Sequence, residues 1–354
     1  MRKNKLKATN IKYALQFKRP AGTSRGVLTS KDSWFIIVHD EEKPDIKGVG
    51  EAGLLPGLSI DNLDTFEDKI NEVCQNISNY QFYLENGLSE FPAIRFALET
   101  ALIDLNRNGK QILYPSDFTK GKDSIEINGL VWMGEYGFMR KQIIEKIESG
   151  FSCIKLKIGA IGFDYEIALI KSIRKEFSEK NIEIRVDANG VFSKDSAFEK
   201  LKMLSDYKLH SIEQPIKQGQ WKEMANLCEI SPLPIALDEE LIGISTKEKK
   251  LELLNTIKPH YIILKPGLLG GFQQSEEWIK LANNNNIGWW ITSALESNIG
   301  LNAIAQWAYT LENKMPQGLG TGQLYTNNFE SPLTIERGRL YYKSEHIMDL
   351  NDLF

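Results

Sequence analysis

The feature that most constrains the fold is a series of short apolar segments that recur at nearly equal intervals, each ending in an ionisable residue. The five terminal residues are Lys157, Asp187, Glu213, Asp238 and Lys265, and they are spaced by 30, 26, 25 and 27 residues. Each interval has the length of one strand and one helix. A chain that alternates strands and helices in this way builds a parallel sheet with helices outside it.

The count of strand-like segments predicts how this sheet closes. Between them lie amphipathic stretches, such as the one with Met139, Ile143, Ile144 and Ile147 at helical spacing. The predicted strands cover residues 125–132, 153–158, 182–187, 210–213, 234–238, 260–265 and 287–292, with a last short one near Gln317. Eight parallel strands close a barrel. We therefore predict an α/β fold with a modified (β/α)8, TIM-like barrel over residues 121–325.

The two ends of the chain have a different pattern. Residues 6–17, 34–39 and 46–51 read as strands, and apolar residues from Phe91 to Leu105 recur at helical steps. This pattern predicts an α+β capping domain over residues 1–120. The tail, 326–354, alternates again at 334–343 and is expected to return to that domain as a strand. Residues 19–26, which include Arg25, read as a loop, either a functional one or a plain surface loop.

Composition narrows the functional classes. The 354 residues are 42% hydrophobic and 25% charged, and the net charge of −4 is spread over alternating Lys and Glu. The sequence has no basic stripe that could attract a phosphate backbone, so we do not expect nucleic-acid binding. No apolar run approaches the roughly 20 residues needed to cross a bilayer, so we expect a cytoplasmic protein without a membrane partner. The three cysteines have no spacing typical of zinc or disulfides.

Side-chain parity places the five ionisable residues together. Alternate residues of a strand point to opposite faces. If Ile154, Leu156 and Ile158 face the helices, Lys155 and Lys157 point into the barrel. The same parity turns the other four terminal residues inward, because the apolar outward positions are Val186, Ile212, Leu237 and Leu264. A single such residue is usually a turn former or lies on a solvated edge. Five with the same period and parity indicate a charged site at the barrel mouth.

These residue types suggest a metal and a base. Three carboxylates, Asp187, Glu213 and Asp238, suit a hard cation such as Mg²⁺, for which Mn²⁺ could substitute. A metal beside a bound carboxylate stabilises the enediolate that forms when the α-proton is removed. A lysine must be neutral to remove that proton. The positive charges of Lys155, the metal and Lys265 would favour the neutral form of Lys157.

The order of short motifs resembles a known family. Lys155-Leu-Lys157, Asp187-Ala-Asn189, Glu213-Gln-Pro, Asp238-Glu-Glu and Lys265-Pro-Gly together resemble the muconate-lactonising subgroup of the enolase superfamily. Three further stretches are similar to the o-succinylbenzoate synthases, the dehydratases of menaquinone biosynthesis. They are Gly50-Glu-Ala-Gly-Leu-Leu-Pro-Gly-Leu-Ser59, Ser293-Ala-Leu-Glu-Ser-Asn-Ile-Gly300 and Gly318-Leu-Gly-Thr-Gly322.

The resemblance implies roles for particular residues. Lys157 would be the catalytic base and acid, and Lys265 would stabilise the intermediate from the opposite face. Asp187, Glu213 and Asp238 would bind the metal. Ser293 would lie near the succinyl carboxylate of a small-molecule carboxylate substrate, Asn189 would contact the substrate or a ligand, and Arg25 would belong to a loop that closes over the barrel mouth.

Two other functions compete with this one. A racemase of N-succinylamino acids or a dipeptide epimerase would use the same metal, with both lysines as bases. The absence of a carboxylate in Gly318-Leu-Gly-Thr-Gly argues against the cationic amino group of a dipeptide. A non-catalytic binding protein would not need both lysines and all three carboxylates. The sequence does not determine the oligomeric state, and an oligomer is compatible with each of these functions.

Overall fold

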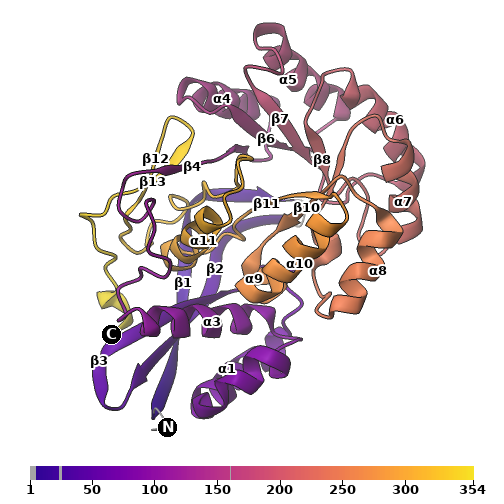
Figure 1. The fold of residues 1–354 in the computed structure, drawn as a ribbon. Coiled ribbons are helices and arrows are strands. Elements are labelled where there is room, and N and C mark those ends of the chain that lie inside the picture. Colours follow the sequence, from indigo (N-terminus) through magenta and orange to yellow (C-terminus); the bar gives the residue numbers. More distant parts are fainter. Residues whose placement is uncertain (1–4, 24–25, 160) are drawn as a thin grey trace.

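The alternation of apolar segments and helices builds a seven-stranded parallel sheet in the order β11-β10-β9-β8-β7-β6-β5. The structure is a computed structural model and describes residues 5–23, 26–159 and 161–354. Helices α4 to α8 lie on the outside of the curved sheet (Figure 1). The elements of this part are β5 (Gly129–Val131), α4 (Tyr136–Glu148), β6 (Cys153–Lys157), α5 (Phe163–Glu176), β7 (Glu183–Asp187), α6 (Lys194–Ser205), β8 (Ser211–Glu213), α7 (Trp221–Ile230), β9 (Ile235–Leu237), α8 (Lys247–Ile257), β10 (Tyr261–Leu264), α9 (Pro266–Leu269), α10 (Phe272–Asn284), β11 (Gly288–Ile291) and α11 (Asn298–Thr310).

A two-residue segment closes the barrel. Gln317 forms a parallel bridge with Ile127, and Gly318 forms one with Thr292. The Gln317 N–H donates to the Glu126 carbonyl at 2.8 Å, and the Gly318 N–H donates to the Ile291 carbonyl at 2.8 Å. The segment therefore takes the eighth position between β11 and the start of the sheet, and the TIM-like barrel predicted from the sequence is confirmed.

The first predicted barrel strand, 125–132, is wrong as a single element. It divides into β4 (Ser124–Glu126) and β5, which belong to different sheets. β4 pairs with β13 (Arg339–Tyr342), whereas β5 pairs with β6. The division falls at Ile127 and Asn128, whose N–H groups donate to Gly338 and Gln317 respectively. A continuous apolar run does not reveal that its two halves have different partners.

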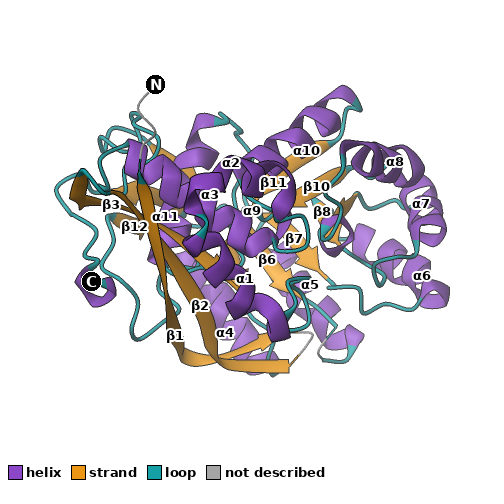
Figure 2. Ribbon diagram, turned by 90° about the horizontal axis from the view of Figure 1, so that it is seen from below, coloured by secondary structure: helices purple, strands orange, loops and turns teal. Residues whose placement is uncertain are grey.

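An antiparallel sheet from the beginning of the chain lies against two helices beside the barrel. The sheet consists of β1 (Leu6–Thr23), β2 (Gly26–Asp40) and β3 (Lys43–Gly53), and its main helices are α1 (Leu63–Gln75) and α3 (Pro92–Asn106), with the short α2 (Tyr80–Phe82) between them. Figure 2 shows the length of β1 and β2. None of the helices in the described residues is long and apolar enough to cross a membrane.

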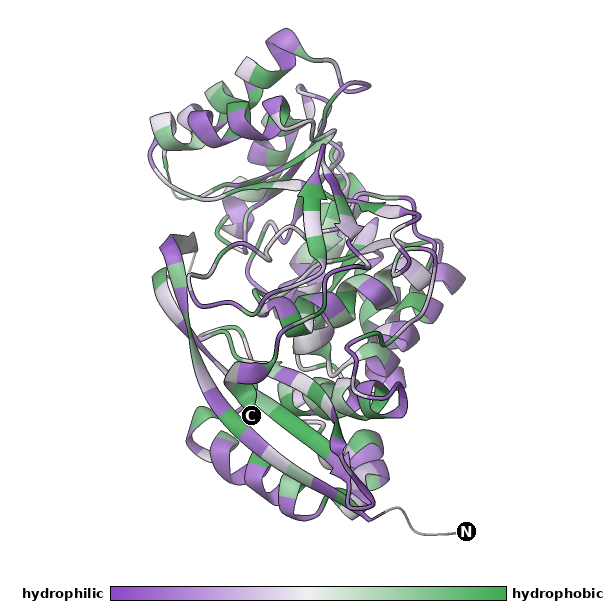
Figure 3. Ribbon diagram, turned by 90° about the vertical axis from the view of Figure 1, so that its left-hand side faces the viewer, coloured by the Kyte–Doolittle hydropathy of each residue, from purple (hydrophilic) through white to green (hydrophobic). Residues whose placement is uncertain are grey.

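Glycines allow α3 to pack closely on this sheet. A Cβ at Gly48 would lie 2.1 Å from the Ala101 carbonyl oxygen, and one at Gly50 would lie 2.0 Å from that of Ala97. The apolar residues of β2 and α3 meet in a buried cluster that includes Trp34, Ile36, Val38 and Leu98. The hydropathy colouring of Figure 3 shows a continuous apolar stretch along the central strand of the sheet, β2.

The loop predicted over residues 19–26 is wrong for most of its length. Residues 19–23 belong to β1 and Gly26 begins β2, with Ala21 paired to Leu28 and Gly22 to Val27. A register shift between Gln16 and Ala21 interrupts the pairing. Small residues and a proline therefore mark an irregular stretch of strand rather than a loop. Arg25 lies outside the described residues.

The tail returns to the first part of the chain, although not through the strand that was predicted. β12 (Leu333–Glu336) and β13 form a hairpin, and β13 pairs with β4 rather than with β1, β2 or β3. Residues beyond the hairpin reach the antiparallel sheet, where Met348 and Leu353 pack in a cluster with Phe35, Ile37 and Val49. The capping region thus includes both ends of the chain.

Candidate active site

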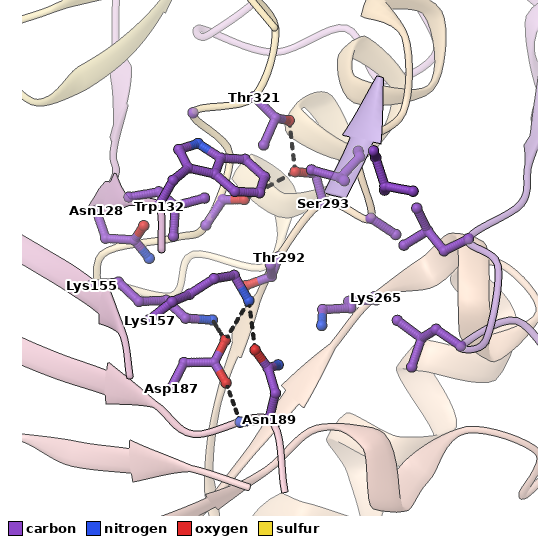
Figure 4. A pocket seen from close by; sticks show the side chains of 18 of the residues that line it. Asn128, Trp132, Lys155, Lys157, Asp187, Asn189, Lys265, Thr292, Ser293 and Thr321 are labelled. Carbon is purple, nitrogen blue, oxygen red and sulfur yellow. Dashed lines mark hydrogen bonds and ion pairs between the residues drawn. The ribbon is translucent and has the colours of Figure 1, made fainter. Parts of the chain in front are cut away.

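A cavity of about 160 Å³ lies between the carboxyl ends of the barrel strands and the capping sheet. Its charged and amide lining comes from strand ends of the barrel, whereas much of its apolar lining comes from the segments around β2 and β3. Figure 4 shows these side chains around the central space. The lining includes Leu28, Leu55, Leu58, Asn128, Trp132, Lys155, Lys157, Asp187, Asn189, Glu239, Lys265, Thr292, Ser293, Leu295, Gly318 and Thr321.

Strand parity positions the charged groups. Ile154, Leu156 and Ile158 are at most 1% exposed and belong to the main core cluster between the sheet and its helices. Val186, Ile212, Leu237 and Leu264 are fully buried in the same cluster. The residues between or after them therefore point to the barrel interior. Their neighbours in space follow from the strand register, in which Lys157 pairs with Asp187 and Asp187 with Glu213.

Lysines and carboxylates alternate at the centre of the site. The Lys155 ammonium lies 3.1 Å from Asp187 Oδ2 and also contacts Glu213 Oε2. The Lys157 ammonium donates to the same Asp187 oxygen at 3.1 Å. Lys265 pairs with Asp238. Lys155, Lys157, Asp187 and Glu213 thus form one connected group, and the Lys265–Asp238 pair lies close enough for its charges to influence that group.

Burial and mutual charge set the protonation of this group. Burial disfavours the Lys155 ammonium, but the carboxylates of Asp187, Glu213 and Asp238 outweigh it and raise the lysine pKa above its ordinary value. Burial also opposes the charge on Asp187, yet Lys155, Lys157 and Lys265 together lower its pKa. Burial raises the pKa of Glu213 well above the ordinary range, and the adjacent Asp187 carboxylate adds to that rise. Lys155 is therefore a fixed positive charge, and Glu213 is the carboxyl least able to stay ionised alone.

Asn189 is held beside Lys157 by a local backbone conformation. It has φ = 46°, in the left-handed region that asparagine tolerates better than most residues. Its N–H donates to Asp187 Oδ1 at 3.0 Å, and its Oδ1 accepts from Lys157 Nζ at 2.9 Å. Its side-chain amide donates to Glu239 at 3.1 Å. Lys157 is therefore oriented by two acceptors, one carboxylate and one amide.

Lys265 approaches the cavity from the side opposite Lys157 (Figure 4). It follows β10 directly and precedes Pro266, where the short helix α9 begins. Its side chain is 12% exposed and that of Lys157 is 15% exposed, so both ammonium groups border the cavity without being open to bulk solvent. Two amines on opposite sides of one space can act on both faces of a bound molecule.

Ser293 lies on the far wall from the carboxylates. Its hydroxyl pairs with that of Thr321 at 2.7 Å and donates to the Gly318 carbonyl at 3.3 Å. The segment Gly318–Thr321 and Ser293 together provide hydroxyl and backbone groups suited to an uncharged or anionic part of a ligand. Arg25, the third residue predicted to bind substrate, cannot be placed because it lies outside the described residues.

Several lining residues were not predicted. Trp132 was read only as the end of a strand, and Thr321 only as part of a glycine-rich stretch. Leu28, Leu55 and Leu58 come from the capping region and cover the cavity opposite the barrel. Apolar residues are common in every part of the chain, so nothing in their local pattern distinguishes cavity walls from core. The stretch Gly50–Ser59, already noted for its resemblance, was the one signal for the leucines at 55 and 58.

The three carboxylates offer an oxygen donor set, but lysine ammonium groups lie among them. Within residues 5–23, 26–159 and 161–354, no three His, Cys, Asp or Glu side chains form a ready metal site. Glu213 Oε1 is buried and accepts no hydrogen bond. A buried carboxylate oxygen without a donor is costly unless a cation or proton approaches it. The donor types and this vacant acceptor fit a hard divalent cation, provided that the lysine side chains turn away.

Comparison with known proteins defines the class. The profile described as Enolase C-terminal domain-like matches residues 139–345. The crystal structure of MenC from Desulfotalea psychrophila LSv54 has a TM-score of 0.84 and 46% identity, and the match covers 95% of this chain and 99% of that one. Dipeptide epimerase from Enterococcus faecalis V583, crystallised with Mg and the dipeptide L-Leu-L-Tyr, shares the fold with a TM-score of 0.82 at 22% identity, over 95% and 97% of the two chains. The chain belongs to the enolase superfamily.

A curated relative narrows the class further. The o-succinylbenzoate synthase of Desulfotalea psychrophila is 51% identical to this chain in an alignment that covers 92% of this chain and 96% of the relative. Within its superfamily the chain is therefore an enzyme, a carbon–oxygen lyase similar to o-succinylbenzoate synthase.

Proposed function

We propose that the chain catalyses the o-succinylbenzoate synthase reaction, the syn loss of water from the cyclohexadiene carboxylate intermediate of menaquinone biosynthesis. The observation that carries this proposal is the 51% identity to a curated o-succinylbenzoate synthase over 92% of the chain. The arrangement of the cavity supports this proposal. The amine of Lys157, the ammonium of Lys155 and the hydroxyl groups of Ser293 and Thr321 surround a space with apolar walls.

Lys157 carries out both proton transfers in this proposal. As the neutral amine, its Nζ removes the proton α to the substrate carboxylate, and the ammonium so formed then delivers that proton to the departing hydroxyl on the same face. Asp187 and Asn189 hold the amine in place through contacts of 3.1 and 2.9 Å. Lys265 contributes positive charge from the opposite side, where negative charge develops on the carboxylate oxygens. Lys155 remains an ammonium that limits the net negative charge of the site.

Asp187, Glu213 and Asp238 would hold the divalent cation. The relative from Enterococcus faecalis was crystallised with Mg, and oxygen ligands from three neighbouring strands suit Mg²⁺, with Mn²⁺ as a substitute. When bound, the cation supplies positive charge beside the substrate carboxylate. The ammonium groups of Lys155 and Lys265, which contact these carboxylates, would then turn toward the substrate.

A racemase acting on N-succinylamino acids is the second candidate, and the opposed positions of Lys157 and Lys265 favour it. Racemisation needs one amine on each face, which this cavity provides. The segment Gly318–Thr321 brings two glycines and a threonine to the cavity and no carboxylate, so the cationic amino group of a dipeptide has no partner in this segment.

The two candidates are separated by a substrate comparison. The purified protein with Mg²⁺ is assayed with the cyclohexadiene carboxylate and, in parallel, with N-succinylamino acids. We expect kcat/KM for dehydration to exceed that for racemisation. A higher kcat/KM for any N-succinylamino acid would reverse the ranking.

A further inference from the structure

A buried carboxylate of the capping sheet is joined to a barrel loop that lines the cavity. Glu51 on β3 is fully buried, and its two oxygens accept hydrogen bonds from the Ser297 N–H at 2.9 Å each. Oε2 also accepts from the Ser297 hydroxyl at 2.5 Å and from the Gly300 N–H at 3.1 Å. Ser297 is the N-cap of α11, so the carboxylate also lies at the positive end of that helix. Residues 246 positions apart thus share one contact.

A second buried charge completes the cluster. The Lys31 ammonium on β2 lies 3.6 Å from Glu51 Oε1, and neither side chain is exposed. Ser33 connects them, since it accepts from Lys31 at 3.2 Å and donates to Glu51 at 2.7 Å. Removing one partner of a buried ion pair strongly destabilises the folded protein, because the other charge is left buried and unpaired. A buried pair linked to Ser33 and to the N-terminus of α11 therefore fixes the capping sheet against that helix.

Glycines keep the space for this cluster open. A Cβ at Gly300 would lie 2.8 Å from Glu51 Oε2, and a Cβ at Gly53 would lie 2.4 Å from Lys31 Nζ. Both glycines belong to the stretches that resemble o-succinylbenzoate synthases. Their lack of a side chain is explained by this contact, not by a turn, because neither has a positive φ.

The loop held by the cluster has a strained backbone. Leu295 has φ = 60°, in the left-handed region that bulky side chains such as leucine rarely adopt. Such a conformation persists only when its surroundings determine it from several sides. Here the Leu295 carbonyl accepts from the Tyr325 hydroxyl at 2.6 Å, and the Ala294 N–H donates to Glu296 at 2.6 Å. Ser293, Ala294 and Leu295 all line the cavity.

Glu296 extends the cluster toward the second lysine. It is 3% exposed, and a Cβ at Gly267 would lie 2.9 Å from its Oε1. Gly267 stands two residues after Lys265, in α9. The loop beside Glu51 is therefore packed against the segment that carries Lys265, and a shift of one would displace the other.

We propose that Glu51, through Ser297, is a positioning residue that holds the loop 292–297 in its strained, substrate-ready conformation. The capping region then does more than cover the cavity, because its docking sets the place of Ser293 and supports that of Lys265. The kinetic part of this inference rests on the proposed dehydration, whereas the structural part does not depend on which substrate is turned over.

A matched control exists in the same interface. Glu99 of α3 is also a capping-region carboxylate that accepts from a barrel helix, with the Phe272 N–H at 2.6 Å and the Gln273 N–H at 3.1 Å. Gly271 makes room for it as Gly300 does for Glu51. None of the described residues that line the cavity belongs to α10. Glu99→Gln therefore disturbs the same kind of contact away from the site.

The test compares Glu51→Gln and Glu99→Gln in the full chain with Mg²⁺. We expect both to lower the Tm. Glu51→Gln should reduce kcat/KM by about 10²-fold, mostly through a higher KM, because displacements of about 1 Å have effects of that size. Glu99→Gln should stay within about threefold of the parent, a change of under 0.7 kcal/mol in transition-state free energy. Amide hydrogen exchange over residues 292–297 should become faster only in Glu51→Gln.

The exchange measurement separates this inference from the proposed function. If the parent protein did not dehydrate the cyclohexadiene carboxylate, the proposed function would fail, and exchange over 292–297 would still decide the role of Glu51. Equal kcat/KM in the two variants of an active protein, or unchanged exchange in Glu51→Gln, would overturn the positioning role. Ser297→Ala, which removes only the hydroxyl donor, provides the same readouts if Glu51→Gln does not fold.

Discussion

Replacing Lys157 by alanine tests the division of labour between the two lysines most directly. In the proposed reaction one amine removes the α-proton and returns it to the leaving hydroxyl. General acid or base catalysis by a positioned group contributes about 10²-fold or more per proton transfer. Loss of both transfers should lower kcat by at least about 10⁴-fold, or about 5.4 kcal/mol at about 1.36 kcal/mol per decade.

The same replacement should leave the fold intact. Asp187, which loses one partner, keeps the Lys155 ammonium at 3.1 Å and the Asn189 N–H at 3.0 Å. The two lost hydrogen bonds, to Asp187 and Asn189, should together cost about 2 kcal/mol of unfolding free energy. With an unfolding entropy of about 2.1 cal/mol/K per residue over a chain of this length, the Tm should fall by only about 3 °C. Calorimetry on the same sample thus separates lost catalysis from lost structure.

Lys265→Arg is the companion variant, because arginine keeps the positive charge but does not readily give up a proton. Dehydration should fall by about one to three decades and remain measurable, whereas any racemisation should vanish. Product formation is quantified by chromatography, and inversion of N-succinylamino acids by proton exchange in D₂O. Dehydration by Lys157→Ala at the parental rate would show that Lys157 is not the base. Racemisation that survived in Lys265→Arg would exclude the two-base mechanism.

Three further predictions follow from the charges. Excess chelator should abolish turnover, and Mg²⁺ or Mn²⁺ should restore it; full activity in chelator, measured after dialysis, would contradict the metal assignment. Glu213→Gln should weaken Mg²⁺ binding in calorimetric titration by about tenfold or more without lowering the Tm, because its pKa is already raised by burial and by Asp187, so removing its charge relieves repulsion; unchanged affinity would remove it from the ligand set. Asp61, whose pKa burial raises to about 7 despite the hydrogen bond from Ala93, binds its proton more tightly in the folded state than in the unfolded chain. Stability should therefore fall as the pH rises from about 4 to about 7, and Asp61→Asn should gain Tm relative to the parent over that window; parallel pH profiles would refute this.

The sequence was most informative where a regular period could be combined with strand parity. Lys157, Asp187 and Glu213 were placed on neighbouring strand ends because the barrel repeats one unit at a time, and in the structure Lys157 contacts Asp187 while Lys155 bridges Asp187 and Glu213. What parity does not determine is which charges pair. The contact of Lys155 with Glu213 and that of Lys265 with Asp238 depend on side-chain rotation inside the barrel, which no linear pattern records.

Contacts between distant parts of the chain could not be predicted from the sequence pattern. The leucines at 28 and 55 reach the cavity only because the capping sheet docks on the barrel mouth. The division of 125–132 into two strands depends on β13, more than 200 residues later. Glu51 was noted only as part of the stretch Gly50–Ser59 that is similar to o-succinylbenzoate synthases, because its partner Ser297 is 246 residues away.

The joining of the two chain ends has a consequence for protein synthesis. Phe35, Ile37 and Val49 of the first sheet are covered by Ile299, Phe329 and Met348. The ribosome must add 299 residues after Val49 before Met348 exists. At about 5–20 residues per second, this takes about 15–60 s, and during that time the residues that cover this apolar sheet face are not all present. A nascent chain released before α11 would lack Ile299, Phe329 and Met348 and would leave that face uncovered.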